Sequence, residues 1–333
     1  MKFLGSLIFS LLVVYGCVTN DDYEQNRHEQ SAEALDLESD YSTLRRQVSN
    51  RRIVTPLLWQ VSKDDKTSYL FGTIHMGVRL GQLPRHIVRK MHGSRTIVLE
   101  NDQRELSGNP ISQFSQKYAD HIYLPKDQKL RDMIGEEAFK LLSEKLALGD
   151  TTLDQMTPRA AQGFLELYAF FQSMRNLPKG MLDLEIAQLA DNQNIQLVAL
   201  EGSEQSLELL KVVLGLDSEK KNNEEAVEFK QFLLEESSEF EKQLNNTLFE
   251  MIYAYKSGDM QRIKEISDRE FKVLPGISKV LLDQRNQEWM RILKKEFDQG
   301  GAFVAVGALH MTGSKSLVSM LTDAGYTVSR IND

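Results

Sequence analysis

The chain has 333 residues, of which 41% are hydrophobic and 26% charged, and its formal net charge at pH 7 is -8. This composition is that of a soluble globular protein with enough apolar residues for a core, in one large domain or two small ones. The acidic balance, with no basic cluster interleaved with aromatic residues, argues against nucleic acid as a partner.

The N-terminus combines a positive charge with a short apolar run. Residues 3–15 are long enough for the core of a signal peptide and too short for an ordinary membrane span. The run ends in Val14-Tyr15-Gly16-Cys17, which resembles a bacterial lipobox, where cleavage precedes a cysteine that then carries lipid. We therefore expect a signal peptide over residues 1–16 and lipidation of Cys17, the only cysteine. An uncleaved anchor or a plain secretory signal is the alternative.

The segment after Cys17 is polar and acidic and has no sustained apolar periodicity. Residues 17–52 are predicted to be a flexible tether, and residues 53–333 a folded domain that this tether holds off the membrane. Val18, rather than Asp, follows the cysteine, which in lipoproteins of this type favours the outer membrane. The expected location is the bacterial cell envelope, with the domain anchored to the outer membrane and facing the periplasm.

Short apolar runs predict the strands of the domain, and helical spacing predicts the segments between them. The strands are expected at residues 57–61, 68–73, 96–100, 195–201, 302–306 and 326–329. Helices are expected at 84–91, 184–192 and 315–324 and in two longer blocks, 112–182 and 204–298, with Thr157 and Asp259 as N-caps. This order predicts an α/β (α+β) fold in which a mixed central β-sheet carries large helical insertions or a cap.

Two copies of a Gly-x-x-His pattern follow predicted strands near opposite ends of the domain. They are Gly72-Thr73-Ile74-His75 and Gly307-Ala308-Leu309-His310. Two further strands end in Glu100 and Glu201. Because ligands bind beyond the carboxyl ends of strands in sheets of this class, we expect these four side chains to lie near one another.

Two histidines and a carboxylate are the ligand types of a catalytic divalent metal, which keeps one position open for water. His75, His310 and Glu100 are the predicted ligands. Glu201 could be a further ligand or the general base, and Asp183, at a helix start, could support a ligand from behind. The alternatives are buried histidines that only pack and glutamates that are solvated at strand ends. The remaining histidines lack the strand context: His28, His86, His92 and His121.

These motifs, with three others in the same order, resemble the TraB/GumN family, which includes the Tiki-type membrane-tethered metalloproteases. The others are Val98-Leu99-Glu100, the pair Leu182-Asp183 and Leu200-Glu201, and Arg285-Asn286-Gln287-Glu288-Trp289. The similarity spans about residues 57–328. It implies an erythromycin-esterase-like or ChaN-like fold and a metal site of His75, His310 and a glutamate, for which Glu100 is the first choice.

The resemblance also implies manganese or cobalt as the metal, with zinc possible, and peptides or other small amides as substrates. Within the Arg-Asn-x-x-Trp motif, Arg285 could bind a substrate carboxylate or the oxyanion through its planar fork, and Asn286 could assist. Trp289 is expected to pack.

The predicted function is that of a membrane-tethered, metal-dependent hydrolase that cuts peptide or amide bonds. The alternative is a non-catalytic envelope protein that binds or sequesters a peptide or a metal. A third reading is a structural lipoprotein whose histidines are packing residues. The sequence leaves open which of Glu100 and Glu201 would be ligand and which base.

Overall fold

The computed structural model describes residues 48, 53, 55–102, 110–146, 148–217, 221–272 and 276–331. The predicted signal peptide, the lipidation site at Cys17 and all but one residue of the predicted tether lie outside these residues. In the part of the chain that is described, no helix combines the length and the apolar character needed to cross a membrane.

A mixed sheet of six strands forms the centre of the domain, in the order β4-β3-β5-β2-β1-β6. Strands β4, β3, β5 and β2 are parallel, whereas β1 is antiparallel to both of its neighbours, β2 and β6. The strands are β1 (Leu58–Lys63), β2 (Lys66–Thr73), β3 (Thr96–Asn101), β4 (Gln196–Glu201), β5 (Ala302–Gly307) and β6 (Thr327–Ile331). The predicted strands, and the α/β class, are confirmed.

Strand β5 is the central element that brings distant parts of the chain together. It pairs with β2 on one side and β3 on the other, and every residue from Ala302 to Val306 is buried. A strand enclosed by two parallel neighbours and covered on both faces needs such an unbroken apolar run. The register sets Thr73 beside Gly307 and Asn101 beside Glu201. The carboxyl ends of four parallel strands therefore share one edge of the sheet.

Two helical insertions interrupt the sheet, as predicted. Between β3 and β4 lie α5 (Pro110–Lys117), α6 (Ala119–Ile122), α7 (Leu130–Ile134), α8 (Glu136–Leu146), α9 (Asp150–Asp154), α10 (Pro158–Met174) and α11 (Leu182–Asn192). Between β4 and β5 lie α12 (Ser203–Val213), α13 (Asn222–Gln231), the π-helix η3 (Phe232–Glu236), α14 (Ser237–Ser257), α15 (Met260–Phe271), the π-helix η4 (Lys279–Gln284) and α16 (Arg285–Gln299).

Shorter connections complete the fold. A 3-10 turn η2 (Leu80–Gln82) and α4 (Arg85–His92) join β2 to β3, and a 3-10 turn η5 (Ala308–Met311) and α17 (Leu317–Asp323) join β5 to β6. Both predicted N-caps are confirmed: Thr157 Oγ1 accepts from Ala160 N, and Asp259 Oδ1 accepts from Arg262 N. Each cap satisfies a backbone donor that the first helical turn leaves unpaired.

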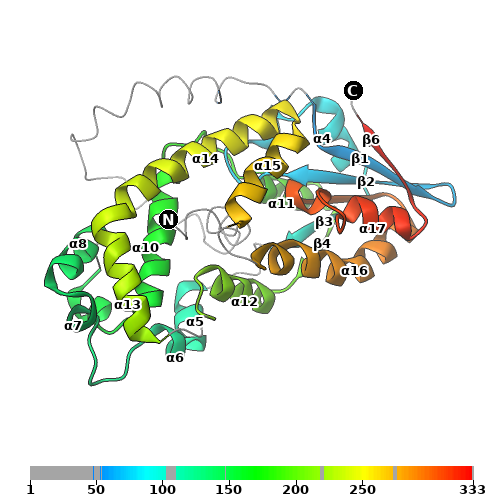
Figure 1. The fold of residues 1–333 in the computed structure, drawn as a ribbon. Helices are drawn as coiled ribbons and strands as arrows, with labels where there is room; N and C mark the ends of the chain where they lie inside the picture. The colour runs from blue at the N-terminus through cyan, green and yellow to red at the C-terminus, as the bar shows by residue number, and fades with distance from the viewer. Residues whose placement is uncertain are drawn as a thin grey trace.

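The helices form a block beside the sheet, and one long helix links the two. In Figure 1 the block of α7, α8, α10 and α13 lies at the left and the sheet at the right, while α14 extends from the block toward the sheet. Helix α16 packs across β1, β2, β4 and β5. The last turns of α14, with α15 and η4, thereby come to lie over the strand ends.

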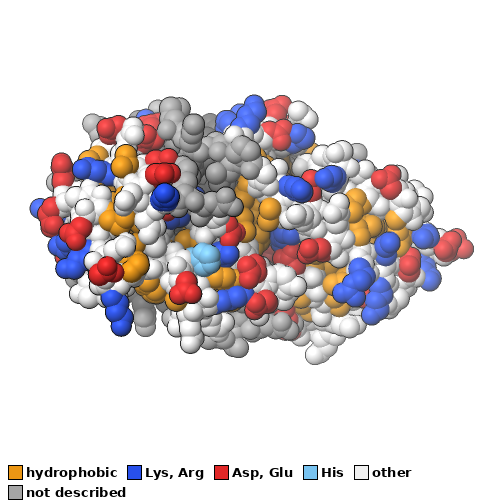
Figure 2. All heavy atoms as spheres, turned by 60° about the horizontal axis from the view of Figure 1, so that its bottom comes forward, with side chains coloured by type: hydrophobic (Ala, Val, Ile, Leu, Met, Phe, Trp, Pro, Cys, Tyr) orange, Lys and Arg blue, Asp and Glu red, His pale blue; other side chains and the backbone are white. Residues whose placement is uncertain are grey.

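Charge on the surface is mixed in sign. Figure 2 shows acidic and basic side chains interspersed over one face of the molecule, with smaller hydrophobic areas between them.

Inside the domain, the ammonium group of the buried residue Lys256 in α14 donates to the carbonyl of Val48, 2.9 Å away. Burial lowers the pKa of this lysine. The contact ties a buried residue of the range predicted as tether to the helix that extends over the strand ends.

Candidate functional site

His75 lies just beyond β2 and is oriented by a carboxylate from α11. Its Nδ1 atom is 2.5 Å from Oδ2 of Asp183, while the other oxygen of Asp183 accepts from Thr73 Oγ1 at 2.7 Å. An ionised carboxylate can only accept, so His75 Nδ1 carries the proton and its Nε2 atom has the free lone pair. Burial lowers the pKa of His75, but the charge and hydrogen bond of Asp183, helped by the Glu100 charge, raise it above its usual value.

His310, in η5, has the same tautomer for a different reason. Its Nδ1 atom is 2.7 Å from Oδ1 of Asn286, whose amide nitrogen is used by the carbonyls of Lys315 and His310 itself. The Nε2 atom therefore carries the lone pair and accepts from Arg285 Nη1 at 3.3 Å. Burial, together with the nearby charge of Arg285 and His75, lowers the pKa of His310 to about 3, against the opposing charge of Glu100. His310 is thus neutral at neutral pH.

Glu100, at the end of β3, is fixed at both oxygens. Oε1 accepts from the backbone N–H of Gly307 at 2.6 Å, and Oε2 accepts from Arg285 Nη2 at 2.7 Å. Burial on its own raises the pKa of Glu100, but Arg285, the two imidazoles and the Gly307 N–H outweigh it and lower the pKa to about 2. The side chain is therefore a permanent carboxylate at neutral pH.

Arg285, the first residue of α16, joins two strand-end carboxylates. Its Nε and Nη2 atoms donate to the two oxygens of Glu201 at 2.6 and 3.0 Å, and Nη2 also reaches Glu100. Trp289, one turn further along α16, donates from Nε1 to Glu201 Oε1 at 2.8 Å. Burial raises the pKa of Glu201, and the guanidinium and indole act against this rise. This bidentate pair is buried and, together with the contact to Glu100, holds β3, β4 and α16 in one arrangement.

The two imidazoles and Glu100 converge beside Gly307. A methyl group built on this glycine would lie 3.2 Å from Glu100 Oε1, 3.6 Å from His75 Nε2 and 3.7 Å from His310 Cδ2. Two imidazole rings and one carboxylate therefore surround a point where the chain has no side chain.

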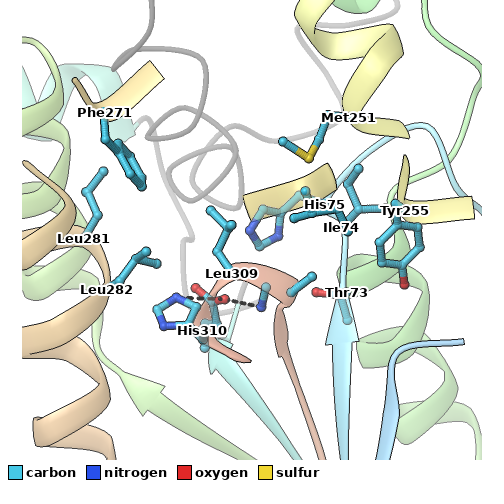
Figure 3. A pocket seen from close by; sticks show the side chains of 14 residues that line it. Thr73, Ile74, His75, Met251, Tyr255, Phe271, Leu281, Leu282, Leu309 and His310 are labelled. Atoms are coloured by element: carbon cyan, nitrogen blue, oxygen red, sulfur yellow. Dashed lines mark hydrogen bonds and ion pairs between the residues drawn. The ribbon is translucent and has the colours of Figure 1, made fainter. Parts of the chain in front are cut away.

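A cavity of about 520 Å³, counting the space open to solvent, lies over this point. Figure 3 shows His75 and His310 at its floor, with hydrophobic side chains around them. Its polar lining consists of Thr73, His75, Glu100, Tyr255 and His310, and its apolar lining includes Ile74, Met251, Ile263, Phe271, Leu281, Leu282 and Leu309. The site is thus a small polar floor under an apolar wall, which is the usual construction of a small-molecule site.

The structure brings together His75, Glu100 and His310, and it places Asp183 and Asn286 directly behind the two histidines. Glu201 and Arg285 do not line this cavity. They face a second, more acidic one of about 780 Å³, also counting open space, on the other side of Arg285. This arrangement therefore does not favour direct contact between Arg285 and a substrate in the first cavity. Arg285 contacts Glu100 and His310 instead.

Several residues of the site were not singled out from the sequence. Thr73 lies inside the first Gly-x-x-His motif and donates to Asp183. Its place in that motif could have marked it as a residue of the site. Tyr255 donates from its hydroxyl to the carbonyl of Gly72 at 2.8 Å, and no motif marks it. Trp289, expected to pack, does pack, with its ring 4.3 Å from that of His310, but it also binds Glu201.

The donor set has the chemistry of a divalent-cation site. Both histidines have their Nδ1 atoms bound to oxygen, the arrangement that fixes metal-ligating imidazoles. Three buried carboxyl groups lie around the floor: Glu100 and Glu201 share the guanidinium of Arg285, and Asp183 pairs with His75, so the charge around the floor also favours a cation.

The spacing is wider than a closed coordination sphere. His310 Nε2 and Glu100 Oε1 are 3.8 Å apart, against roughly 3.3 Å for two ligands of a tetrahedral ion at about 2 Å. Among the residues that the structure describes, no three His, Cys, Asp or Glu side chains form a ready metal cage. The residues fit a metal by their chemistry and tautomers and by the point on which they converge.

Comparison with known proteins adds the family. Residues 57–330 match the TraB/PrgY/gumN family, a span that covers the whole sheet except the last residue of β6 and includes every residue of the site. No curated protein and no solved structure matches the chain significantly, so the likeness to erythromycin-esterase and ChaN folds stays a prediction. With the family match extending over most of the sequence and over both Gly-x-x-His motifs, the chain belongs to the TraB/PrgY/gumN family.

Proposed function

We propose that this protein is a metal-dependent hydrolase that cuts peptide or other small amide bonds in the cavity beside Gly307. The observation that carries the proposal is the convergence of the imidazoles of His75 and His310 with the Glu100 carboxylate at the floor of that cavity. His75, His310 and Glu100 would hold the divalent cation, with manganese, cobalt and zinc as the candidates. When bound, such an ion lowers the pKa of water to about 7 and polarises a carbonyl.

The other residues of the site prepare this floor. Asp183 keeps the proton of His75 on Nδ1, and its negative charge makes the Nε2 lone pair a stronger electron-pair donor to a metal ion. Asn286 does the same for His310 without adding charge. Arg285 keeps Glu100 ionised and aimed at the Gly307 N–H, and Glu201 keeps Arg285 in place. The apolar wall excludes water from the substrate side, which strengthens electrostatic interactions at the floor.

Metal binding and peptide cleavage test the proposal. The wild-type protein, freed of metal with a chelator, is titrated with Mn²⁺, Co²⁺ and Zn²⁺ and incubated with a peptide library whose products are identified by mass spectrometry. His75→Ala and His310→Ala are expected to abolish both stoichiometric metal binding and metal-stimulated cleavage. His92→Ala, an exposed histidine at the end of α4, is the matched control and should retain both.

Three outcomes would reject parts of this function. Cleavage that survives both substitutions ends the proposal. Stoichiometric metal or peptide binding without any turnover favours the alternative of an envelope protein that sequesters its ligand. Cleavage that survives the chelator but not His75→Ala would assign the reaction to the His75–Asp183 pair as a base without a metal.

We also propose that the protein is a lipoprotein of the bacterial outer membrane, facing the periplasm. The support is the sequence that ends in Gly16-Cys17 after a short apolar run, together with Val18. Labelled palmitate should be incorporated into the wild-type protein and not into Cys17→Ala, and the wild type should fractionate with outer membranes. Absence of label from the wild type would refute the lipid anchor.

A further inference from the structure

The wall of the cavity differs sharply from its floor. Among the residues that the structure describes, the side chains that the second helical insertion contributes to it are apolar apart from Tyr255, and none is charged. They come from successive elements: Met251 of α14, Ile263 and Phe271 of α15, and Leu281 and Leu282 of η4. In Figure 3, Phe271, Leu281 and Leu282 lie together on one side of the cavity, while Met251 and Ile74 lie near His75.

This wall is only partly sealed, unlike an ordinary core. Leu281 is 1% exposed, but Phe271 and Leu282 are half-buried and border the open space of the cavity. Space bounded by apolar side chains stays poor in ordered water and takes up apolar groups. A charged group placed against this wall would lose its hydration without gaining a partner, because the described side chains of the wall carry no charge.

The wall is also fixed relative to the floor. The π-helix η4 ends at Gln284, so Leu281 and Leu282 lie four and three positions before Arg285, whose guanidinium binds Glu100. Arg285 Nη1 also donates to the carbonyl of Leu281 at 3.2 Å. Single π-turns recur at functional sites, where they redirect side chains. The same few residues therefore set both the position of Glu100 and that of the apolar side chains.

We infer that this wall is a specificity subsite for one uncharged, apolar side chain next to the bond presented to the floor. The inference rests on the proposed hydrolase function and adds its substrate class: peptides with a residue such as Leu, Met or Phe beside the cleaved bond. An apolar pocket distinguishes side chains that differ by a few carbon atoms by about 10–200-fold. We expect a Leu side chain to be favoured over Gly or Lys by about that factor.

The affinity of N-acetyl amino acid amides tests the subsite without requiring turnover. Amides of Gly, Leu, Met, Phe, Lys and Glu are titrated into the wild-type protein by ligand-observed NMR, and peptides that differ only in the same side chain are compared for cleavage. The Leu, Met and Phe amides should bind at least about tenfold more tightly than the Gly, Lys and Glu amides. Equal affinity across the series would overturn the inference.

A matched pair of variants locates the preference. Leu282→Asp puts a charge in the wall, and Val280→Asp puts the same charge at a half-buried position of the same π-helix that lines the second cavity. Leu282→Asp should weaken the Leu amide about tenfold or more and reverse the order of the Leu and Lys amides, whereas Val280→Asp should leave their ratio unchanged. An unchanged ratio in folded Leu282→Asp would overturn the inference.

A second variant covers the case in which Leu282→Asp does not fold. Phe271→Ala enlarges the space beside the wall, so it should shift the preference from Leu toward Phe. No shift would count against the subsite. Failure of the subsite and failure of the hydrolase are distinguishable. Selective binding of apolar amides without cleavage rejects only the hydrolase, and cleavage with no side-chain preference rejects only the subsite.

Discussion

Asp183 Oδ2 lies 2.5 Å from Nδ1 of His75, so a residue in the first turn of α11 sets the tautomer of a histidine that is 108 positions earlier in the chain. Thr73 holds the second oxygen of the same carboxylate. The contact joins the end of β2 to the first helical insertion. It gives the Nε2 atom of His75 its lone pair and directs the charge of Asp183 toward the cavity floor.

Asp183→Asn is expected to weaken metal binding. The asparagine oxygen can still accept from Thr73, but its NH2 group would then face His75 and move the imidazole proton to Nε2, where it blocks the ligand lone pair. Loss of such a partner reduces metal affinity by about 10–100-fold. Competition with a chelating dye measures the effect, and Asp191→Asn, exposed on the same helix, is the control. Equal affinity of both variants would show that Asp183 does not act through His75.

Gly307→Ala is expected to fill the point on which the ligands converge while leaving the fold intact. The backbone of Gly307 has φ -51° and ψ 136°, which alanine adopts without strain, so the free energy of unfolding should change by about 1 kcal/mol or less. The methyl group would lie 3.2 Å from Glu100 Oε1 and 3.6 Å from His75 Nε2. Metal affinity and cleavage should therefore fall about tenfold or more.

Gly202→Ala is the matched control for Gly307→Ala. Gly202 directly follows β4, whereas Gly307 ends β5; it has φ -92°, and Gln205 Oε1 is the nearest atom to an added methyl group. Metal titration and thermal unfolding of both variants separate the two effects. Full metal affinity in Gly307→Ala would place the ion elsewhere.

Arg285→Leu is expected to destabilise the fold, because it leaves Glu100 and Glu201 buried without their shared cation. Breaking one partner of a buried ion pair costs about 3–5 kcal/mol. Adding Glu201→Gln removes one of the orphaned charges and should restore about 1–3 kcal/mol of that loss. Urea unfolding of the two variants measures the difference. If the double variant is no more stable than Arg285→Leu, the two side chains are not coupled as the structure shows.

Glu166, buried in α10, is expected to make stability depend on pH. Its hydrogen bond from Gln162 Nε2 is 2.8 Å long, and burial raises its pKa from 4.5 to about 7, against the charge of Arg159 and the Gln162 bond. Between pH 4.5 and pH 7 the folded state therefore keeps a proton that the unfolded state has lost. The stability that this proton contributes is complete below pH 4.5 and is lost as the pH rises through 7.

Glu166→Gln removes this dependence. The variant should match the wild type near pH 4 and be more stable by up to about 3 kcal/mol at pH 8, because it never carries the buried charge. Urea unfolding at the two pH values tests this, with the exposed residue Glu137→Gln as the control. A difference that is independent of pH would mean that Glu166 does not titrate in this range.

The site was predictable from sequence to the extent that its residues stand at strand ends. His75, Glu100 and His310 follow apolar runs whose strands proved to be parallel neighbours, so their side chains share one edge of the sheet. Asp183 and Asn286 were expected to support the site, and their side chains contact Nδ1 of His75 and of His310. Glu201 ends a strand as well, but β4 is at the edge of the sheet, and Arg285 holds its carboxylate away from the first cavity.

The cavity wall could not be predicted in the same way. Met251, Phe271 and Leu282 lie on amphipathic helices whose apolar residues have the same spacing whether they fill a core or border a cavity. Which of these side chains meets empty space depends on where α14, α15 and η4 pack over the strand ends. The role of Tyr255 could not be predicted either. Its hydroxyl donates to a backbone carbonyl, and such a partner cannot be inferred from residue types.

By itself, the sequence determined the strands, the two Gly-x-x-His units, the strand-end carboxylates and the membership of a family, because period-2 and short apolar runs are local properties of the chain. Only the tertiary structure decided that Glu100 rather than Glu201 faces the imidazoles, and that Arg285 stands behind the floor. It also decided that the wall is apolar. These features depend on the order of the parallel strands and on where helices that are far apart in the sequence pack against them. Both follow from packing across the whole domain.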